Sequence, residues 1–479
     1  MSEDGAHYRL PETTHAYARE QLIHAGEVDE TFRALAGYVT QQCTSKSDIT
    51  DDAKFKWLAR CTRNLDTARA CLEWAIIDAK DPIAGLALIS KTLPFWMLAS
   101  RLIEHREYLE PALALVAELR PRRKADELAL EVAIALARYY SGGPTNDIIT
   151  RLRRALALAR KQDAKAHELN ILWMLYGISG NAGNYQAEMD FARQFDLACS
   201  ESGERQTRTR RHRLLARAHS DEGEQRTALK EIERALHPPL PRARAQLDAY
   251  SIEDVTAALA IRSRILWIMG RADDAMIASE ECLARGLAID HAQSICWSIA
   301  FNLCPVAIWS GDFANANRFA ALAIAQSQKT LEHWNEWANL YQVALEHAQD
   351  GNMPVHLRNR MIPAQKDIFA TLWPAFAGDD ISARAVKQTS WCSAELMRLA
   401  AARADAVVGL RLLQQADLLA KQQDGLAWRL RIAISLAERH VARDERVKAR
   451  GALAPVYDCF KQGLKTRDLR IAAEILDTI

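Results

Sequence analysis

The apolar residues along the chain follow the period of an α-helix. Between residues 252 and 269 they recur at steps of three and four, which places them in one stripe along a helix. The residues at these steps are Val255, Leu259, Arg262, Leu266 and Met269, and the apolar ones among them make the stripe. Gly270 follows and can end the helix with a left-handed residue. The next segment puts the small residues Ala275, Ala278 and Cys282 on one face, which allows two helices to pack closely.

A turn-plus-helix phrase recurs along the chain. In each copy a glycine and then a polar residue precede an alanine that lies about five positions after the glycine. Four copies begin at Gly183, Gly223, Gly270 and Gly311, with gaps of 40, 47 and 41 residues, and a weaker copy begins at Asp444. Such a period, with two amphipathic helices per unit, is typical of a tetratricopeptide-like array, whose usual unit has ~34 residues. We therefore predict an all-α fold, a tetratricopeptide-like α-solenoid of antiparallel helix pairs, in which each repeat contacts mainly its neighbours.

The composition is uniform along the 479 residues, because no linker rich in proline, glycine or serine and no block of charge divides them. From Gly351 to Ile381, however, three prolines and two glycines interrupt the helical pattern, so we expect a bend or a mobile loop there. The predicted organisation is connecting helices at 1–50, the opening helices of the solenoid at 51–160, repeats at 161–350, the irregular segment at 351–381 and further repeats at 382–479.

Net charge and cysteine content indicate in which compartment the protein works and which partners it lacks. Sixty-two basic against 61 acidic residues give a net charge of +1, so no global field attracts nucleic acid or an anionic membrane. The nine cysteines are scattered and form neither a CxxC motif nor a Cys/His ligand spacing, which predicts reduced thiols and no metal site. The N-terminus lacks the basic and then apolar residues of a signal peptide, and no run approaches the ~18 apolar residues of a membrane span. We expect a cytoplasmic protein without a membrane partner.

Several stretches, in order along the chain, resemble the C-terminal half of STAND-class bacterial regulators. The stretches are "YRLPETTHAYAREQL" from Tyr8, "NLDTARACLEWA" from Asn64, "LPFWMLASRLIEHREYLEPALAL" from Leu93, "CPVAIWSGDFANANRFAALAI" from Cys304, "SWCSAELMRLAA" from Ser390 and a final one from Leu426. That family joins winged helices and a P-loop ATPase to a tetratricopeptide-like sensor array. The resemblance implies that residues 1–50 hold the remnant of a winged helix and that the rest is the sensor array.

The departures from that family are as informative as the matches. The chain contains no Gly-Lys dipeptide, so the GxxxxGK[ST] loop that holds nucleotide phosphates is absent, and we expect no ATP hydrolysis and no cofactor. His15 and Pro11 stand where the family has Arg and Leu. Pro11 can start a helix that Gly26 ends, and residues 1–10, as a single strand of a winged helix, are expected to be irregular.

An aromatic set is the first candidate for a binding surface. It consists of Trp297, Trp309, Trp334, Trp337 and Tyr341, the last three of which share one helical face. Concave faces of solenoids use such residues to hold partners. The alternative is that these rings pack between adjacent repeats, as large aromatic residues commonly do.

A basic block is the second candidate. The stretch from Arg205 to Arg217 contains Arg208, Arg210, Arg211 and Arg213, which could meet phosphate or an acidic helix. It has no interleaved aromatic residues and lies next to the acidic "SDEGE". The alternative is therefore a helix face on which the arginines form internal ion pairs.

No catalytic motif is present, since the sequence contains neither HExxH nor GxSxG. The favoured hypothesis is a non-enzymatic scaffold that binds a protein or small-molecule effector in a solenoid groove, in signal transduction or transcriptional regulation, with an ATPase/DNA-binding regulator encoded nearby as a further candidate partner. The alternative hypothesis is a DNA-binding regulator that acts through the Arg205–Arg217 block. A hydrolase or transferase on a helical scaffold is a third.

Overall fold

The computed structural model describes residues 12–44, 57, 59–98, 102–140, 145–200, 205–237, 252–330, 333–348, 354–387 and 389–479. In these ranges the chain forms α-helices with short 3-10 and π segments and contains no strand, which confirms the all-α, tetratricopeptide-like fold. The chain forms two compact units, residues 1–158 and 159–479. The predicted winged-helix remnant at residues 1–10, together with Pro11, lies outside the described residues.

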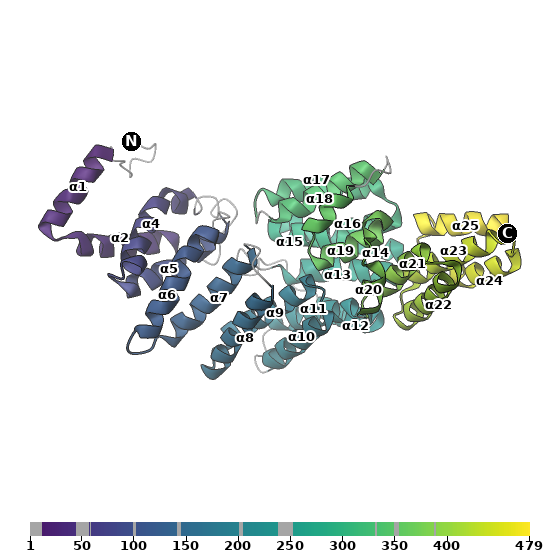
Figure 1. The fold of residues 1–479 in the computed structure, drawn as a ribbon, viewed down its shortest axis with the longest axis horizontal. Coiled ribbons are helices and arrows are strands. Elements are labelled where there is room, and N and C mark those ends of the chain that lie inside the picture. Colours follow the sequence, from purple (N-terminus) through teal and green to yellow (C-terminus); the bar gives the residue numbers. More distant parts are fainter. Residues whose placement is uncertain are drawn as a thin grey trace. The chain divides into compact units, whose positions relative to one another are not determined.

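The first unit is built from helices that follow one another along the chain (Figure 1). They are α1 (Glu12–Ala25), α2 (Val28–Cys43), α4 (Leu65–Leu72), the π-helix η1 (Glu73–Ile77), α5 (Pro82–Leu98), α6 (Leu102–Glu118), α7 (Lys124–Tyr140) and α8 (Thr145–Lys161), whose last residues belong to the second unit. Gly26 follows α1 with a φ of 71°, as expected for a residue that ends a helix.

The second unit begins with an array of helix pairs that we call the first array (residues 165–348). Its helices are α9 (Lys165–Asn181), α10 (Tyr185–Ser200), α11 (Arg205–Asp221), α12 (Gln225–Leu236), α13 (Asp254–Ile268), α14 (Ala272–Ala288), α15 (Ala292–Ser298), the π-helix η2 (Ile299–Leu303), α16 (Cys304–Ser310), α17 (Phe313–Ser327) and α18 (His333–Ala348). The glycines of the repeated phrase lie in the turns between paired helices, and all have positive φ: Gly183 69°, Gly223 93°, Gly270 83° and Gly311 78°. The glycine spacing therefore marked the turns correctly.

The rest of the second unit forms what we call the second array (residues 363–479). It contains α19 (Pro363–Leu372), the 3-10 helix η4 (Pro374–Ala377), α20 (Ile381–Lys387), α21 (Ser393–Arg403), α22 (Ala406–Gln422), α23 (Leu426–Val441), α24 (Arg446–Tyr457) and α25 (Arg467–Thr478). The 3-10 helix η3 (Val355–Arg360) precedes it. Three prolines stand at helix starts here: Pro354 just before η3, Pro363 first in α19 and Pro374 first in η4.

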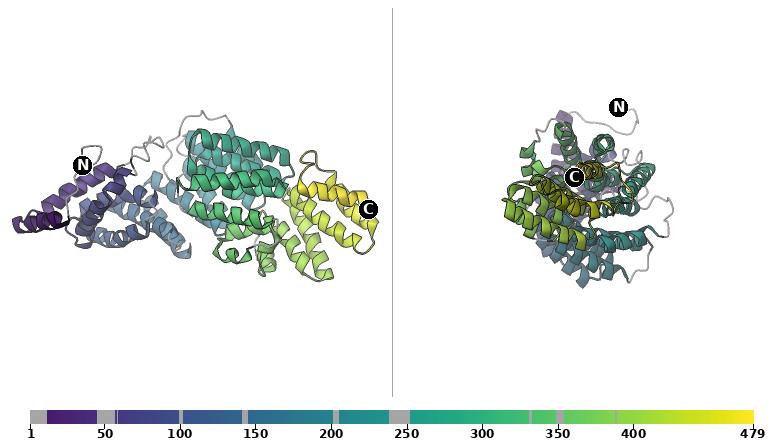
Figure 2. Two further views of the ribbon diagram at one scale, coloured as in Figure 1. Left: turned by 90° about the horizontal axis from the view of Figure 1, so that it is seen from above. Right: turned by 90° about the vertical axis from the view of Figure 1, so that its right-hand side faces the viewer.

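The two arrays pack against each other, so contacts are not confined to neighbouring repeats. Helix α13 contacts α23, α16 contacts α19 and α25, and α9 contacts α19 (Figures 1 and 2). The four glycine turns of the first array meet the second: a Cβ added at each would lie within 3.4 Å of Pro363, Gln423, Leu426 or Arg467 respectively. The prediction that each repeat contacts mainly its neighbours was therefore incomplete.

Helix α13 corrects the predicted apolar stripe. Val255, Leu259, Arg262 and Met269 are only half-buried, whereas residues on the other sides of the helix, such as Ala257, Ile261, Arg264 and Ile265, are buried. The reason is that α13 is surrounded by α11, α12, α14, α15 and, from the second array, α23. A helix covered on nearly every side has no single buried stripe for the sequence to reveal. The next helix is as predicted, with Ala275, Ala278 and Cys282 all buried.

The stretch from Ala292 to Ser310 is long and apolar enough to cross a membrane by length and composition, which the sequence analysis had not recognised. In the structure it is α15, η2 and α16, and the whole apolar window is buried inside the second unit. Its apolar character therefore matches a core position in the array.

The glycine turns give a stability test. Gly270→Ala should lower the free energy of unfolding by about 1–2 kcal/mol for the left-handed conformation alone, with a further loss because its Cβ would lie 2.9 Å from Leu426 and Phe460 side-chain carbons. The control is Gly451→Ala, in the middle of α24 with open space around it, which should be stabilising by ~0.5–1 kcal/mol. Chemical denaturation followed by circular dichroism measures both. A loss for Gly270→Ala no larger than the cost of the left-handed conformation alone would contradict the close approach of the arrays at Gly270.

Candidate functional site

The basic block lies on α11, and the guanidinium groups of Arg210, Arg211 and Arg213 are ion-paired. Arg210 Nε lies 3.1 Å from Asp254 Oδ2, and Arg213 Nε lies 2.9 Å from the other oxygen of the same carboxylate. Arg211 Nε lies 2.8 Å from Asp196 Oδ1, while Arg208 is exposed. Arg213 is only 2% exposed and cannot offer its charge to a partner. The geometry matches the ion-paired alternative, and phosphate binding by the remaining arginines stays a prediction.

The aromatic set lies inside the first array, and each of its members is at most 5% exposed: Trp297, Trp309, Trp334, Trp337 and Tyr341. The indole nitrogens of Trp309 and Trp334 donate hydrogen bonds to Thr371 Oγ1 at 3.1 Å and to Gln293 Oε1 at 2.7 Å. The rings occupy the space between helices, as the packing alternative describes. Their role in binding a partner stays a prediction.

Tyr341 has a particular structural task at the π-helix η2. Pro305, in the first turn of α16, has no N–H to donate, and the N–H of Cys304 bonds to Ile299 O, one residue further back than in an α-helix. These two features take away the backbone donors that Ala300 O would use. The hydroxyl of Tyr341 donates to that oxygen at 2.7 Å, which satisfies a carbonyl that is otherwise buried in the core.

Four tryptophans that the sequence analysis did not group together meet where the arrays touch. The ring centroid of Trp267 lies 4.7 Å from that of Trp309 and 5.1 Å from that of Trp428, and Trp391 lies 5.9 Å and 6.2 Å from the last two. Arg431 lies over the rings of Trp267 and Trp428. No spacing in the sequence could have shown this cluster, because its members come from three helices and from the turn before α21, two in each array.

A buried cluster of charged side chains lies next to the tryptophans. Asp221 accepts hydrogen bonds from Arg217 Nε at 3.2 Å and from Arg264 Nη2. Glu188 Oε1 lies 3.3 Å from the same Arg217 Nε. Arg264 also lies over the ring of Trp391, whose backbone N–H donates to Asp221 O at 3.0 Å. The cluster therefore joins α10, α11 and α13 to Trp391 of the second array.

Arg217 is the centre of this charge cluster. Its guanidinium carbon lies 5.6 Å from the ring centroid of Tyr176, 5.8 Å from that of Trp297 and 5.5 Å from that of Phe301. Rings at this distance attract a cation through their quadrupoles. Arg217 was predicted only as the end of a basic block, and in the structure it is a buried side chain that connects α11 with α9, α15 and η2.

A second buried polar contact between the arrays involves Asp367 of α19. Its carboxylate accepts a hydrogen bond from the hydroxyl of Tyr185 at 3.0 Å and another from Arg384. Burial raises the pKa of Asp367, and the Arg384 charge and hydrogen bond oppose that rise. Burial also raises the pKa of the Tyr185 hydroxyl, which therefore stays a donor. The pairing fixes the start of the second array on α10.

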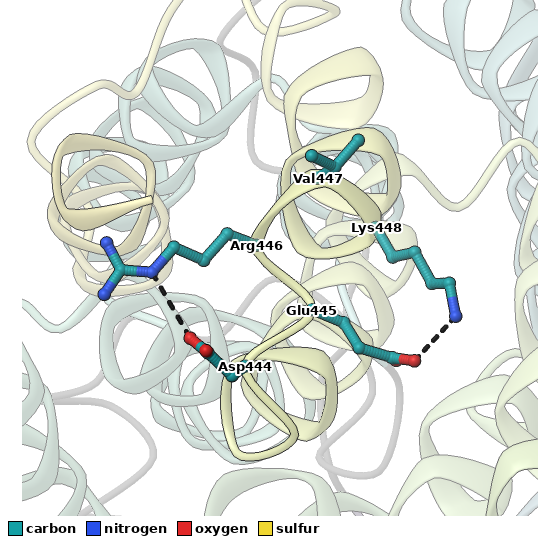
Figure 3. Close-up of a pocket in the computed structure, with 5 residues that line it drawn as sticks. All are labelled: Asp444, Glu445, Arg446, Val447 and Lys448. Carbon is teal, nitrogen blue, oxygen red and sulfur yellow. Dashed lines mark hydrogen bonds and ion pairs between the residues drawn. The ribbon is translucent and has the colours of Figure 1, made fainter.

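Two hollows of the described structure do not combine convergent polar groups with enclosure. One, of about 530 Å³, lies at the turn into α24 and is lined by Asp444, Glu445, Arg446, Val447 and Lys448. Their side chains spread apart from this one turn, with the charged ones paired to each other (Figure 3). Another, of about 20 Å³, lies against Trp267 and Trp309 and has room for about one water molecule. Within the described residues no group of histidine, cysteine and acidic side chains could hold a metal ion.

Comparison with known proteins gives a partial relationship. Over 202 residues the chain is 30% identical to candidate HTH-type transcriptional regulators of Mycobacterium bovis and Mycobacterium tuberculosis, a match that covers 40% of this chain and 22% of each relative. Part of the chain is homologous to HTH-type transcriptional regulators. The chain thus spans about a fifth of the length of the curated relatives it matches. No family model matches the sequence.

Among solved structures, the chain is similar to a Rap protein complexed with competence and sporulation factor. The TM-score is 0.43 and the sequence identity 13%, over 90% of this chain and 99% of the Rap chain.

The arginines of α11 should differ sharply in their effect on stability. Arg213→Glu should lower the free energy of unfolding by about 3–5 kcal/mol, because it leaves a buried position with a charge that repels Asp254. Arg208→Glu, on the exposed side of the same helix, should change it by no more than ~0.5 kcal/mol. Chemical denaturation of the two variants compares them directly. Similar small effects would favour a solvated basic patch over the buried ion pair.

The difference in burial among the arginines of α11 also decides which of them are suitable for testing the DNA-binding alternative. Arg208→Glu and Arg211→Glu alter charge with the least damage to the core, so they are better probes than Arg213→Glu. If the basic block binds duplex DNA, the first two substitutions should weaken a salt-sensitive mobility shift. Unchanged binding in both variants would remove the basic block from that hypothesis.

Tyr341→Phe should lower the free energy of unfolding by about 1–3 kcal/mol, because Ala300 O loses its donor in a buried position. The matched control is Tyr457→Phe, a half-buried tyrosine at the end of α24, for which we expect a change within ~0.5 kcal/mol. Thermal and chemical unfolding measure both variants. Equal stability of Tyr341→Phe and the wild type would contradict the role assigned to this hydroxyl.

Proposed function

We propose that the chain is a non-enzymatic interaction scaffold in transcriptional regulation, equivalent to the sensor array of a STAND-class regulator. The observation that carries the proposal is the 202-residue match to HTH-type transcriptional regulators. The helical array supports it, since repeats of this kind commonly bind proteins or small effectors. The assignment to the sensor array of a STAND-class regulator is supported by the sequence resemblance to that class, which runs in order along the chain.

The chemistry of the described residues supports a scaffold. The polar clusters in the core pair arginines with carboxylates, so the charges of these groups are engaged with each other. The sequence also lacks the phosphate-binding loop of the regulators that it resembles. We therefore assign ATP hydrolysis and DNA binding to other polypeptide segments or proteins, and effector or protein binding to this chain. Location in the cytoplasm belongs to the same proposal, because the cysteines described are free thiols and all but Cys459 are buried.

Two measurements test the proposal together. Deletion of the gene, followed by RNA sequencing, should change the transcript levels of a defined set of genes, and expression of the full chain should restore them. The purified chain should show no ATP turnover above a blank. ATP hydrolysis that follows the protein through gel filtration, or an unchanged set of transcripts, would contradict the proposal.

The native partner can be sought in the same strain. A tagged full chain should co-purify with a protein that carries a P-loop and a winged helix if a separate regulator supplies these domains. Reading the DNA upstream for an in-frame P-loop domain distinguishes that arrangement from a single longer polypeptide.

A further inference from the structure

Glu188 is the least compensated charged group in the buried cluster. Asp221 accepts aligned hydrogen bonds from both Arg217 and Arg264. Glu188 lies 3.3 Å from Arg217 Nε, but neither of its oxygens accepts an aligned hydrogen bond from the described residues. The two carboxyl groups therefore share Arg217, whose aligned hydrogen bond goes to Asp221.

The surroundings of Glu188 come from three elements. From α11 it faces Arg217 and Asp221, from α13 it faces Arg264, and from α9 it faces the hydroxyl of Tyr176. The backbone of α9 closes one side, because a Cβ added at Gly180 would lie 2.7 Å from the carboxyl carbon of Glu188. Glu188 is 0% exposed, so bulk solvent does not reach its carboxyl group.

A buried carboxylate that lacks hydrogen bonds is costly in free energy, so this environment favours the neutral acid. Burial raises the pKa of Glu188 from its ordinary value of 4.5 to about 8. The negative charge of Asp221 adds to the rise, while the charges of Arg217 and Arg264 and a weaker interaction with the Tyr176 hydroxyl oppose it. The group is therefore protonated at pH 6 and ionised at pH 9. Ionisation creates a second carboxylate that competes with Asp221 for Arg217.

We propose that Arg217 exchanges between Asp221 and Glu188 as Glu188 gains and loses its proton, so that this cluster is a proton-dependent switch inside the first array. The inference goes beyond the proposed regulatory function and does not depend on the identity of a partner.

The movement of Arg217 has a defined path through the structure. Its guanidinium lies against the rings of Tyr176, Trp297 and Phe301, so a shift toward Glu188 changes its contacts with α15 and η2. A shift away from Asp221 leaves Arg264 as the aligned donor to that carboxylate, next to Trp391 of the second array. The proton on Glu188 is thereby linked to the packing between the two arrays.

The sign of the pH dependence follows from the pKa of Glu188. Between about pH 4.5 and 8 the folded chain holds a proton that the unfolded chain releases. Stability therefore falls as pH rises through this range, by up to about tenfold in the folding equilibrium constant per pH unit. The contribution is fully present below the lower value and is lost above the higher one.

The test compares the full-length wild type with Glu188→Gln and with a control, Glu168→Gln. Glu168 is also a largely buried glutamate of the first array, but Arg160 and Lys165 pair with it and lower its pKa against the opposing effect of burial. Folding equilibrium constants are measured by chemical denaturation from pH 6 to pH 9. We expect the wild type and Glu168→Gln to lose stability over this range and Glu188→Gln to lose markedly less.

Hydrogen exchange shows whether the switch moves structure. After correction for the intrinsic exchange rate, amides in α11 and η2 should exchange faster at pH 9 than at pH 6 in the wild type and in Glu168→Gln, but equally in Glu188→Gln. Parallel pH profiles of the wild type and Glu188→Gln would overturn the proposal. If Glu188→Gln does not fold, carboxyl ¹³C spectra of glutamate-labelled wild type decide: a resonance that titrates near pH 8 and is also present in Glu168→Gln supports the switch, and its absence overturns it.

Discussion

The contact of four tryptophans between the two arrays is the interaction on which the second unit depends. Trp267 and Trp309 come from the first array, and Trp391 and Trp428 come from the second. Each such side chain removes roughly 150–250 Å² from water when it is buried. The two rings of each array pack against the two rings of the other array, so each array helps to bury the tryptophans of its neighbour. The second unit therefore behaves as one packed body, whereas an ordinary solenoid is stabilised only between neighbouring repeats.

Polar groups accompany the tryptophans across the same boundary, and this determines how the arrays fit. Arg264 pairs with Asp221 while it lies over Trp391, and Arg431 pairs with Glu395 and Asp468 while it lies over Trp267 and Trp428. A buried guanidinium needs its partners at fixed positions, because an unpaired charge in the core is strongly unfavourable. The apolar rings thus supply area. Ion pairs hold each arginine within its own array, and each guanidinium lies over a ring of the other array, which fixes the register of one array on the other. A change of charge within such a cluster can alter the packing of both arrays, because a tightly packed interior transmits local shifts to its neighbours.

The sequence foresaw local structure better than long-range packing. The helical period, the small faces such as that of Ala275 and Ala278, and the glycine turns are confirmed because each depends on the backbone and on residues within a few positions. The stripe on α13 was wrong because α23, about 170 residues later, covers the same helix from another side. The aromatic residues could not be assigned from spacing, since a partner surface and a repeat interface use the same residue types.

The sequence by itself determined the all-α class, the position of the repeat turns and the relationship to transcriptional regulators, because these follow from helical period, glycine spacing and identity along the chain. Only the tertiary structure decided that the second array closes over the turns of the first and that Glu188, Arg217, Asp221 and Arg264 share one buried site. The physical reason is that ion-pair partners and ring contacts are selected by distance in space. Burial then decides whether a carboxyl group in the sequence is a solvated charge or a neutral acid in the core.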